Sequence, residues 1–153
     1  MSRGGPDRKP LIALVHNADR AFQAHMVREA HARSRPDIKP AHNHLFGVLG
    51  DDGDRPAALA ARAGITRQSM GEVIRDLVGL GILEMVPDPD DGRAKVVRYT
   101  DEGTALTNEG FRHLGDLEDR FTEEFGEDYE AARAVLDRVV TILEELDAGL
   151  GQG

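Results

Sequence analysis

The segment RPAALAARAGITRQSMGEVIRDLVGLG, residues 55–81, has the pattern of two short helices joined by a tight turn. Pro56 suits the first turn of a helix, and the alanines that follow it are good helix formers. Gly64 lies where a tight turn is expected, and Thr66 is suited to cap the helix that comes next. The segment is therefore predicted to form a helix–turn–helix.

The second helix of this pair is predicted to have one apolar side and one polar side. Its apolar residues recur at helical spacing, and Ile65 before the cap can form a hydrophobic staple with Met70. Gly79 and Gly81 are expected to end the helix. The residues that lie off the apolar stripe are Arg67, Gln68, Gly71, Glu72 and Arg75.

Two strand-like runs follow, residues 82–86 and 94–100, with a turn of Pro, Asp and Gly between them. This pattern predicts a β-hairpin. Thr100 is expected to cap a further helix, whose positive end Asp101 and Glu102 would stabilise. Helix, turn, helix and hairpin in this order indicate a winged helix–turn–helix, in which the second helix lies in the DNA major groove.

The rest of the chain is predicted to be helical. Apolar residues recur at helical spacing from residue 11 to about 33 and along residues 101–150, and a short helix is expected over 41–49. The apolar stripes after residue 101 exceed what a small helix–turn–helix core needs. The sequence therefore predicts a mainly α (α+β) fold, with residues 1–9 as a flexible tail.

Composition limits the class of protein. The chain has 153 residues, of which 40% are hydrophobic and 31% charged, as in a soluble globular protein. No apolar run is long enough to cross a bilayer, the start lacks the apolar core of a signal peptide, and the cytoplasm is the expected location. The absence of cysteine excludes disulfides and thiolate chemistry.

Acidic charge is concentrated in the last third of the chain. The formal net charge is −9, and residues 101–153 carry four Lys and Arg against fifteen Asp and Glu. Residues 54–100 carry seven of each sign. The overall charge argues against non-specific nucleic-acid binding by the whole surface, but a local basic patch can exist in the neutral middle.

Candidate DNA contacts follow from the winged helix–turn–helix. The N-terminal residues of the second helix meet base edges, where Arg pairs with guanine and Gln with adenine. A wing can place Arg in the adjacent minor groove, and Asp91 is expected to hold Arg93 by an ion pair. Solvated surface charge is the alternative interpretation of each cation. The candidate DNA-binding residues are Arg67, Gln68, Ser69, Glu72, Arg75, Arg93 and Lys95.

Residues 58–103 resemble the MarR family of transcription regulators. The matching motifs are LAARAGITRQSM, GLGILE, PDPDDGRA and YTDEG, the last two corresponding to the wing and to the entry into the next helix. The chain departs from the family pattern at four positions, and each departure removes positive charge that would favour phosphate contact. Gly92 replaces a common wing Arg, Met85 and Val86 stand where Arg pairs are frequent, and Glu72 occupies an often basic position.

The resemblance implies a single MarR-type domain over residues 10–153. Within it, residues 41–100 would form the winged lobe, and residues 10–35 and 101–150 would form dimerisation helices. Such a homodimer would bind double-stranded DNA at a pseudo-palindrome with half-sites about 34 Å apart. It would act as a repressor released by a small organic effector, bound between the dimerisation helices and the lobe. His16, His42 and Phe46 are the candidate pocket residues.

Zinc sensing, protein interaction and catalysis are the alternative functions. A zinc-sensing regulator would use His25, His42, His44 or His113, although His42 and His44 on one helix would point about 200° apart. Ordinary surface or capping histidines are the alternative, and no metal or cofactor is expected. A winged helix used only for protein interaction needs no basic group on both helix and wing. No Ser-His-Asp spacing, phosphate-binding Gly loop or HExxH motif appears, so the chain is not expected to be an enzyme.

Overall fold

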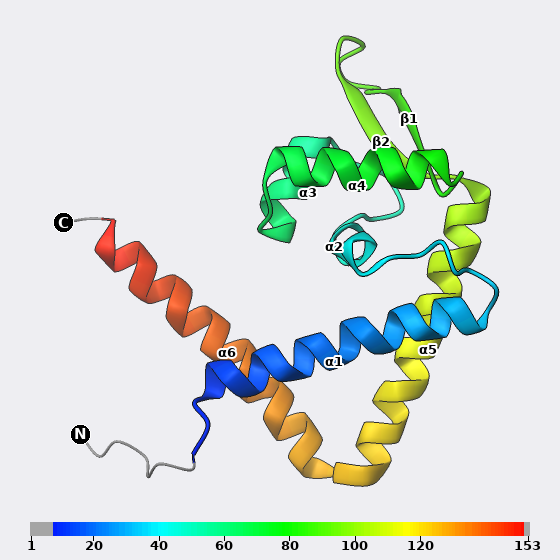
Figure 1. Ribbon diagram of the computed structural model, residues 1–153. Coiled ribbons are helices and arrows are strands. Elements are labelled where there is room, and N and C mark those ends of the chain that lie inside the picture. Colours follow the sequence, from blue (N-terminus) through cyan, green and yellow to red (C-terminus); the bar gives the residue numbers. More distant parts are fainter. Residues whose placement is uncertain (1–7, 152–153) are drawn as a thin grey trace. The chain divides into compact units, whose positions relative to one another are not determined.

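The computed structural model describes residues 8–151, so most of the predicted tail lies outside the described residues. The described chain is mainly helical with one small sheet, and the predicted fold class is confirmed. It divides into two compact units, one ending at Gly110 and the other beginning at Phe111. The elements in order are α1 (Leu11–Ala32), a 3₁₀ turn (Pro40–His42), α2 (Asn43–Phe46), α3 (Pro56–Ala63), α4 (Arg67–Gly79), β1 (Leu83–Pro87), β2 (Lys95–Tyr99), α5 (Asp101–Phe125) and α6 (Glu127–Leu150) (Figure 1).

The helix–turn–helix forms as its sequence predicts. Pro56 is the first residue of α3, and Gly64 ends the helix with a φ of 66°, a conformation that suits glycine. Thr66 caps α4, because its Oγ1 accepts a hydrogen bond from the backbone N–H of Ser69 at 3.0 Å. These two local signals fix the turn between α3 and α4.

The hairpin projects from the lobe as the wing (Figure 1). β1 and β2 pair antiparallel from Leu83↔Tyr99 to Pro87↔Lys95. The hairpin also makes a contact that no sequence pattern predicted, in which Asp54 forms a β-bridge with Val97. Gly53, with a φ of 77°, permits this approach, since a Cβ there would clash with the carbonyl oxygen of Val97.

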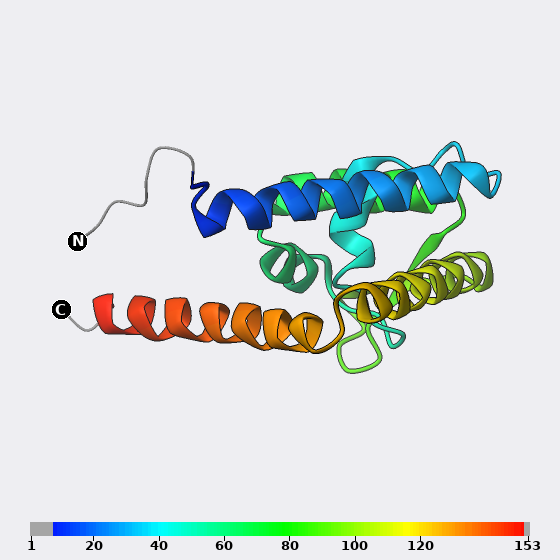
Figure 2. The ribbon, with the colours of Figure 1, turned by 90° about the horizontal axis from the view of Figure 1, so that it is seen from below.

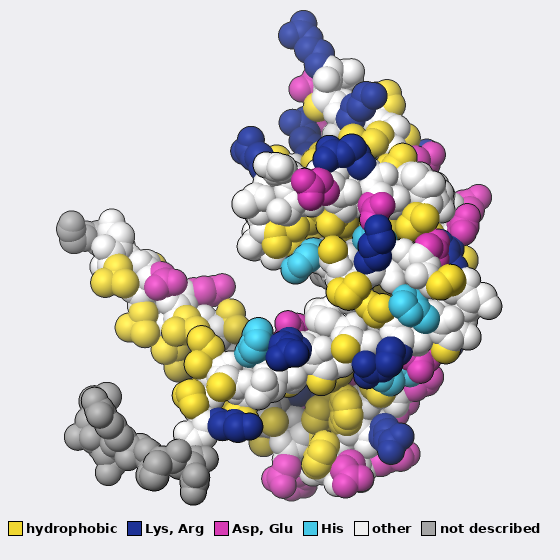
Figure 3. Space-filling view, in the orientation of Figure 1, with side chains coloured by type: hydrophobic (Ala, Val, Ile, Leu, Met, Phe, Trp, Pro, Cys, Tyr) yellow, Lys and Arg dark blue, Asp and Glu magenta, His cyan; other side chains and the backbone are white. Residues whose placement is uncertain are grey.

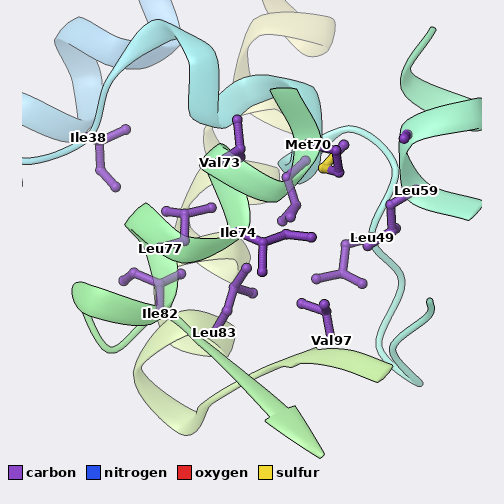
Figure 4. Close-up of a cluster of buried hydrophobic side chains, with 12 residues drawn as sticks. Ile38, Leu49, Leu59, Met70, Val73, Ile74, Leu77, Ile82, Leu83 and Val97 are labelled. Atoms are coloured by element: carbon purple, nitrogen blue, oxygen red, sulfur yellow. The ribbon is translucent and has the colours of Figure 1, made fainter. Parts of the chain in front are cut away.

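A single apolar cluster holds α4 and the sheet to the rest of the lobe (Figure 4). Its members come from the segment before α3, from α3, from α4 and from the hairpin, which explains why the lobe forms one core. The buried members are Ile38, Leu45, Leu49, Leu59, Ala60, Met70, Val73, Ile74, Leu77, Ile82, Leu83 and Val97.

The short helix expected over residues 41–49 differs in the structure. It begins as a 3₁₀ turn at Pro40, continues as α2, and ends at Phe46 before Gly47. The last turn is held by hydrogen bonds of the Val48 and Leu49 backbones to Leu45. Glycine costs helix stability, so the regular helix stops there while Leu49 still reaches the core.

Thr100 fastens the start of α5 to the end of α4. Its Oγ1 accepts from the backbone N–H of Gly103 at 3.0 Å and donates to the carbonyl of Gly81 at 2.6 Å. Gly103 is buried so close to the Ile82 carbonyl that a Cβ would clash with it. The predicted cap is confirmed. The close approach to Ile82 also explains why the YTDEG motif has a glycine at this position.

The second unit consists of the end of α5 and the whole of α6, which runs as one uninterrupted helix (Figure 2). Gly126, with a φ of 55°, separates the two helices. The Glu118 carboxylate accepts from the Tyr129 hydroxyl at 2.6 Å and from the Arg133 guanidinium. This contact, together with Phe121 against the Tyr129 ring, fixes the hairpin of helices.

No residue of α6 is buried, although the helix carries a long apolar stripe. Hydrophobic side chains along it are plainly exposed (Figure 3). Those side chains are Val135, Leu136, Val140, Ile142, Leu143, Leu146 and Leu150. Over residues 8–151, no helix has the length and apolar character needed to cross a membrane.

Candidate nucleic-acid interface

Helix α4 places its predicted contact residues outward. Met70, Val73, Ile74 and Leu77 are buried against the core and so fix the rotation of the helix. The opposite side, which is exposed, carries Arg67, Gln68, Ser69, Glu72 and Arg75. The structure therefore brings these five residues to one surface, while their contact with DNA stays a prediction.

The cations of the lobe fall into two groups. One group is held by internal ion pairs, and the other is not. Figure 3 shows Lys and Arg side chains around the wing and α4. The paired cations are Arg33, Arg35, Lys39, Arg55, Arg62 and Arg98. The cations between residues 33 and 98 that form no ion pair or hydrogen bond through their side chains within residues 8–151 are Arg67, Arg75, Arg93 and Lys95. These four are the cations among the seven predicted DNA contacts.

Arg55 and Asp88 anchor the base of the wing. Arg55 immediately precedes α3, and its Nη2 lies 2.6 Å from Oδ2 of Asp88, which follows β1. Asp88 also accepts from the backbone N–H of Asp90 at 2.9 Å. This N–H and the Arg55 guanidinium hold the pKa of the Asp88 carboxyl below its usual value. The wing is thus tied through a charged contact to the helix–turn–helix.

At the wing tip the predicted ion pair is wrong. Asp91 accepts from the backbone N–H of Arg93 at 3.1 Å, so it shapes the turn without holding the guanidinium. Its other oxygen lies 3.9 Å from Arg55, which draws the carboxylate toward the wing base. Arg93 and Lys95 are both exposed at the projecting end of the hairpin.

His42 is buried between the α2 region and α4. Its Nδ1 accepts from the backbone N–H of Lys39 at 3.1 Å, so neutral His42 carries its hydrogen on Nε2 and donates to Asp76 at 3.0 Å. Lys39 Nζ also lies 2.8 Å from Asp76. The Lys39 ammonium first, and His42 second, hold the pKa of Asp76 below its usual value. Sequence reasoning missed Asp76 because its partners lie more than 30 positions away.

The candidate effector residues are not all alike. His42 and the half-buried Phe46 meet edge to face, with ring centroids 6.5 Å apart, whereas His16 is exposed on α1. Because both ring nitrogens of His42 are hydrogen-bonded, this conformation leaves it no lone pair for a metal. His44 is exposed, and His25 and His113 are half-buried. Their roles in a pocket or a metal site stay predictions.

Comparison with known proteins places this architecture. Residues 37–94 match the model of the MarR family. The transcriptional regulator MntR of Escherichia coli O157:H7 is 29% identical over 136 residues, covering 87% of this chain and 82% of that protein. The structure resembles the transcriptional repressor CouR bound to a 23-mer DNA duplex, with a TM-score of 0.69, 22% identity, and coverage of 94% of this chain and 99% of that one. PcaV of Streptomyces coelicolor, in complex with its natural ligand, has a TM-score of 0.62 and 24% identity, with coverage of 92% and 97%.

The fold and the exposed surface of α4 and the wing define a winged helix–turn–helix protein. The family match over residues 37–94 confirms the resemblance found in the sequence: these residues are similar to the MarR family of transcription regulators.

Proposed function

We propose that this protein is a homodimeric repressor that binds a pseudo-palindromic DNA operator and is released by a small organic effector. The proposed DNA-binding surface is supported by one observation: some cations of the lobe form internal ion pairs and others do not. Arg67 and Arg75 on α4, and Arg93 and Lys95 on the wing, have no internal ion pair among residues 8–151. Such cations are available for phosphates and base edges, whereas the paired ones would first have to break a contact.

The dimer is supported by the apolar surface that the single chain leaves exposed. Leu143 and Leu146 on α6 are 56% and 60% exposed, and Ile12 on α1 is 78% exposed. Burial of apolar surface is worth about 25 cal/mol per Å², so a second copy that covers these helices gains substantial stability. Closed two-fold symmetry then gives two α4 helices for two half-sites.

Release by an effector is supported by the solved structure of PcaV with its natural ligand, since that protein shares this fold. In this chain His42 and Phe46 form a small aromatic contact against the recognition helix, because His42 donates to Asp76 on α4. A ligand that displaces this contact would change the support of α4. His16, His42 and Phe46 remain the proposed pocket residues.

The test is a gel shift with DNA from upstream of the gene, beside sedimentation of the free protein. We expect a dimer that binds one near-palindromic site, and a loss of about tenfold in affinity for Arg93→Ala with the dimer intact, since one good contact contributes about 1–3 kcal/mol. Unchanged affinity of Arg93→Ala at moderate salt would refute the wing assignment. A dimer that binds no DNA would instead indicate a protein-interaction module.

A further inference from the structure

Glu72 places a negative charge on the surface proposed to bind DNA. It is exposed on α4, four residues after Gln68 and three before Arg75, so the three side chains share one side of the helix. Phosphates repel a carboxylate, and therefore Glu72 opposes general DNA affinity. A carboxylate on this surface therefore calls for a compensating contact.

The other carboxylates on α4 and the wing strands are neutralised. Asp76 pairs with Lys39 and His42, and Glu84 pairs with Arg98 at 2.7 Å. Glu72 has no ion pair or hydrogen bond through its side chain with any residue in 8–151. Arg67 and Arg75, the two arginines of α4, form no ion pair with Glu72 in the structure.

Arg75 lies on the same side of the helix but forms no ion pair with the Glu72 carboxylate. A Cβ added to Gly71 would lie 3.4 Å from its Nη1, so the guanidinium extends back over the glycine. Gly71 has no side chain to occupy that space. Glu72 and Arg75 consequently present an acceptor and a donor side by side.

An ionised carboxylate can only accept hydrogen bonds. In the major groove guanine presents two acceptors, and thymine presents an acceptor and a methyl group. Neither base therefore offers a hydrogen-bond donor to a carboxylate. Adenine places its acceptor N7 beside its amino group. Cytosine presents its N4 amino group as a donor, and it is the base with which Glu pairs.

We propose that Glu72 is a specificity-determining residue that reads the N4 amino group of a cytosine in each half-site. This inference rests on the proposed DNA binding and adds the identity of one base pair to it. A good contact of this kind discriminates by about 5- to 150-fold against other base pairs. It also predicts that Glu72 lowers affinity for DNA that lacks the cytosine.

The experiment is selection of bound duplexes from a randomised pool by the full-length protein, its Glu72→Gln and Glu72→Ala variants, and a matched control. Glu123→Gln removes the same charge from an exposed position on α5, outside the lobe. We expect the wild type and Glu123→Gln to select the same site, with a C·G pair in fixed orientation at one symmetric position. Glu72→Ala should lose that preference, and Glu72→Gln should weaken it and admit adenine.

Affinity for non-cognate DNA supplies a second measurement. Both Glu72 variants should bind it more tightly than the wild type, while keeping the remaining selected bases. If the Glu72 variants select the same bases as the wild type at every position, or if the base they release is not a cytosine, the inference is overturned. If the wild type selects no site at all, the proposed DNA-binding function itself fails.

Discussion

Arg55 and Asp88 lie 33 positions apart in the chain, yet their charged groups meet at 2.6 Å and join the start of α3 to the base of the wing. Asp88 is only 8% exposed, so the contact is shielded on the side of the carboxylate. Since Arg93 and Lys95 reach outward from the same hairpin, this pair fixes where the wing cations lie relative to α4.

Replacing Arg55 with Ala should therefore weaken operator binding without unfolding the lobe. The wing would lose its anchor and sample more orientations, so ordering it on DNA would cost entropy. Fluorescence anisotropy with labelled operator gives the affinity, and circular dichroism reports the fold. Arg62→Ala, which removes the neighbouring pair with Asp54, is the control and should have the smaller effect. Equal effects of the two substitutions would argue against a wing anchor.

The wing cations should determine part of the salt dependence of binding. Each phosphate contact contributes about 0.9 to the slope of log affinity against log salt, so Arg93→Ala with Lys95→Ala should lower the slope by about 1.8 if both contact phosphates. Titrations at several salt concentrations measure this slope. Arg112→Ala on α5 is the control and should leave the slope unchanged. An unchanged slope in the double variant would show that neither Arg93 nor Lys95 contacts the DNA phosphates.

Gly103→Ala should destabilise the protein. The new Cβ would overlap the carbonyl oxygen of Ile82, and relieving the overlap would displace α5 from the end of α4, at a cost of about 1–3 kcal/mol or more. Gly115→Ala, in the same helix with no atom within 4 Å of the added Cβ, should instead stabilise by about 0.5–1 kcal/mol. Urea unfolding of both variants tests this contrast. If Gly103→Ala proved as stable as the wild type, the close approach of Gly103 to the Ile82 carbonyl would be contradicted.

Tyr99 should make stability depend on alkaline pH. Burial first, and the Asp51 charge second, raise the pKa of its hydroxyl to about 12. An unfolded tyrosine ionises near pH 10, so between about pH 10 and 12 the unfolded state loses a proton that the folded state keeps. The stabilising contribution is complete below pH 10 and is lost as the pH rises to 12.

Denaturation at pH 9 and pH 11 measures this loss of stability. The difference in unfolding free energy between the two pH values should be smaller in Tyr99→Phe, because phenylalanine has no ionisable hydroxyl. Because the chain has two tyrosines and no tryptophan, absorbance at alkaline pH in a Tyr129→Phe background follows Tyr99 alone. Ionisation of Tyr99 near pH 10 in the folded protein would show that the hydroxyl is not shielded.

Leu143→Glu should dissociate the proposed dimer. Leu143 is 56% exposed in the single chain, and a charge there could not be buried against a second copy without a partner. Sedimentation at micromolar concentration should show a smaller species, while Glu144→Gln beside it should remain a dimer. A wild-type protein that sediments as a folded monomer would refute the interface altogether.

Local signals in the sequence predicted most of the elements. Pro56, Gly64, Thr66 and Thr100 each act on backbone within a few residues, so their capping and turn roles are confirmed in the structure. The short helix was predicted to extend to residue 49 but ends at Phe46, because Gly47 disfavours the helical conformation. Apolar spacing likewise identified the buried side of α4, and with it four of the five outward residues: Arg67, Gln68, Glu72 and Arg75.

What the sequence alone determined is therefore the order of elements, the face of α4 that packs, and the positions of the cations along the chain. Tertiary structure decided which of the lobe's cations are paired and which are free for a DNA contact. The Arg55–Asp88, Lys39–Asp76 and Arg98–Glu84 contacts join residues that are distant along the chain, and no local pattern marks them. Their formation depends on the packing of the core, which brings charges together only after the apolar residues are buried. Within residues 8–151, this packing leaves the Glu72 carboxylate without a partner.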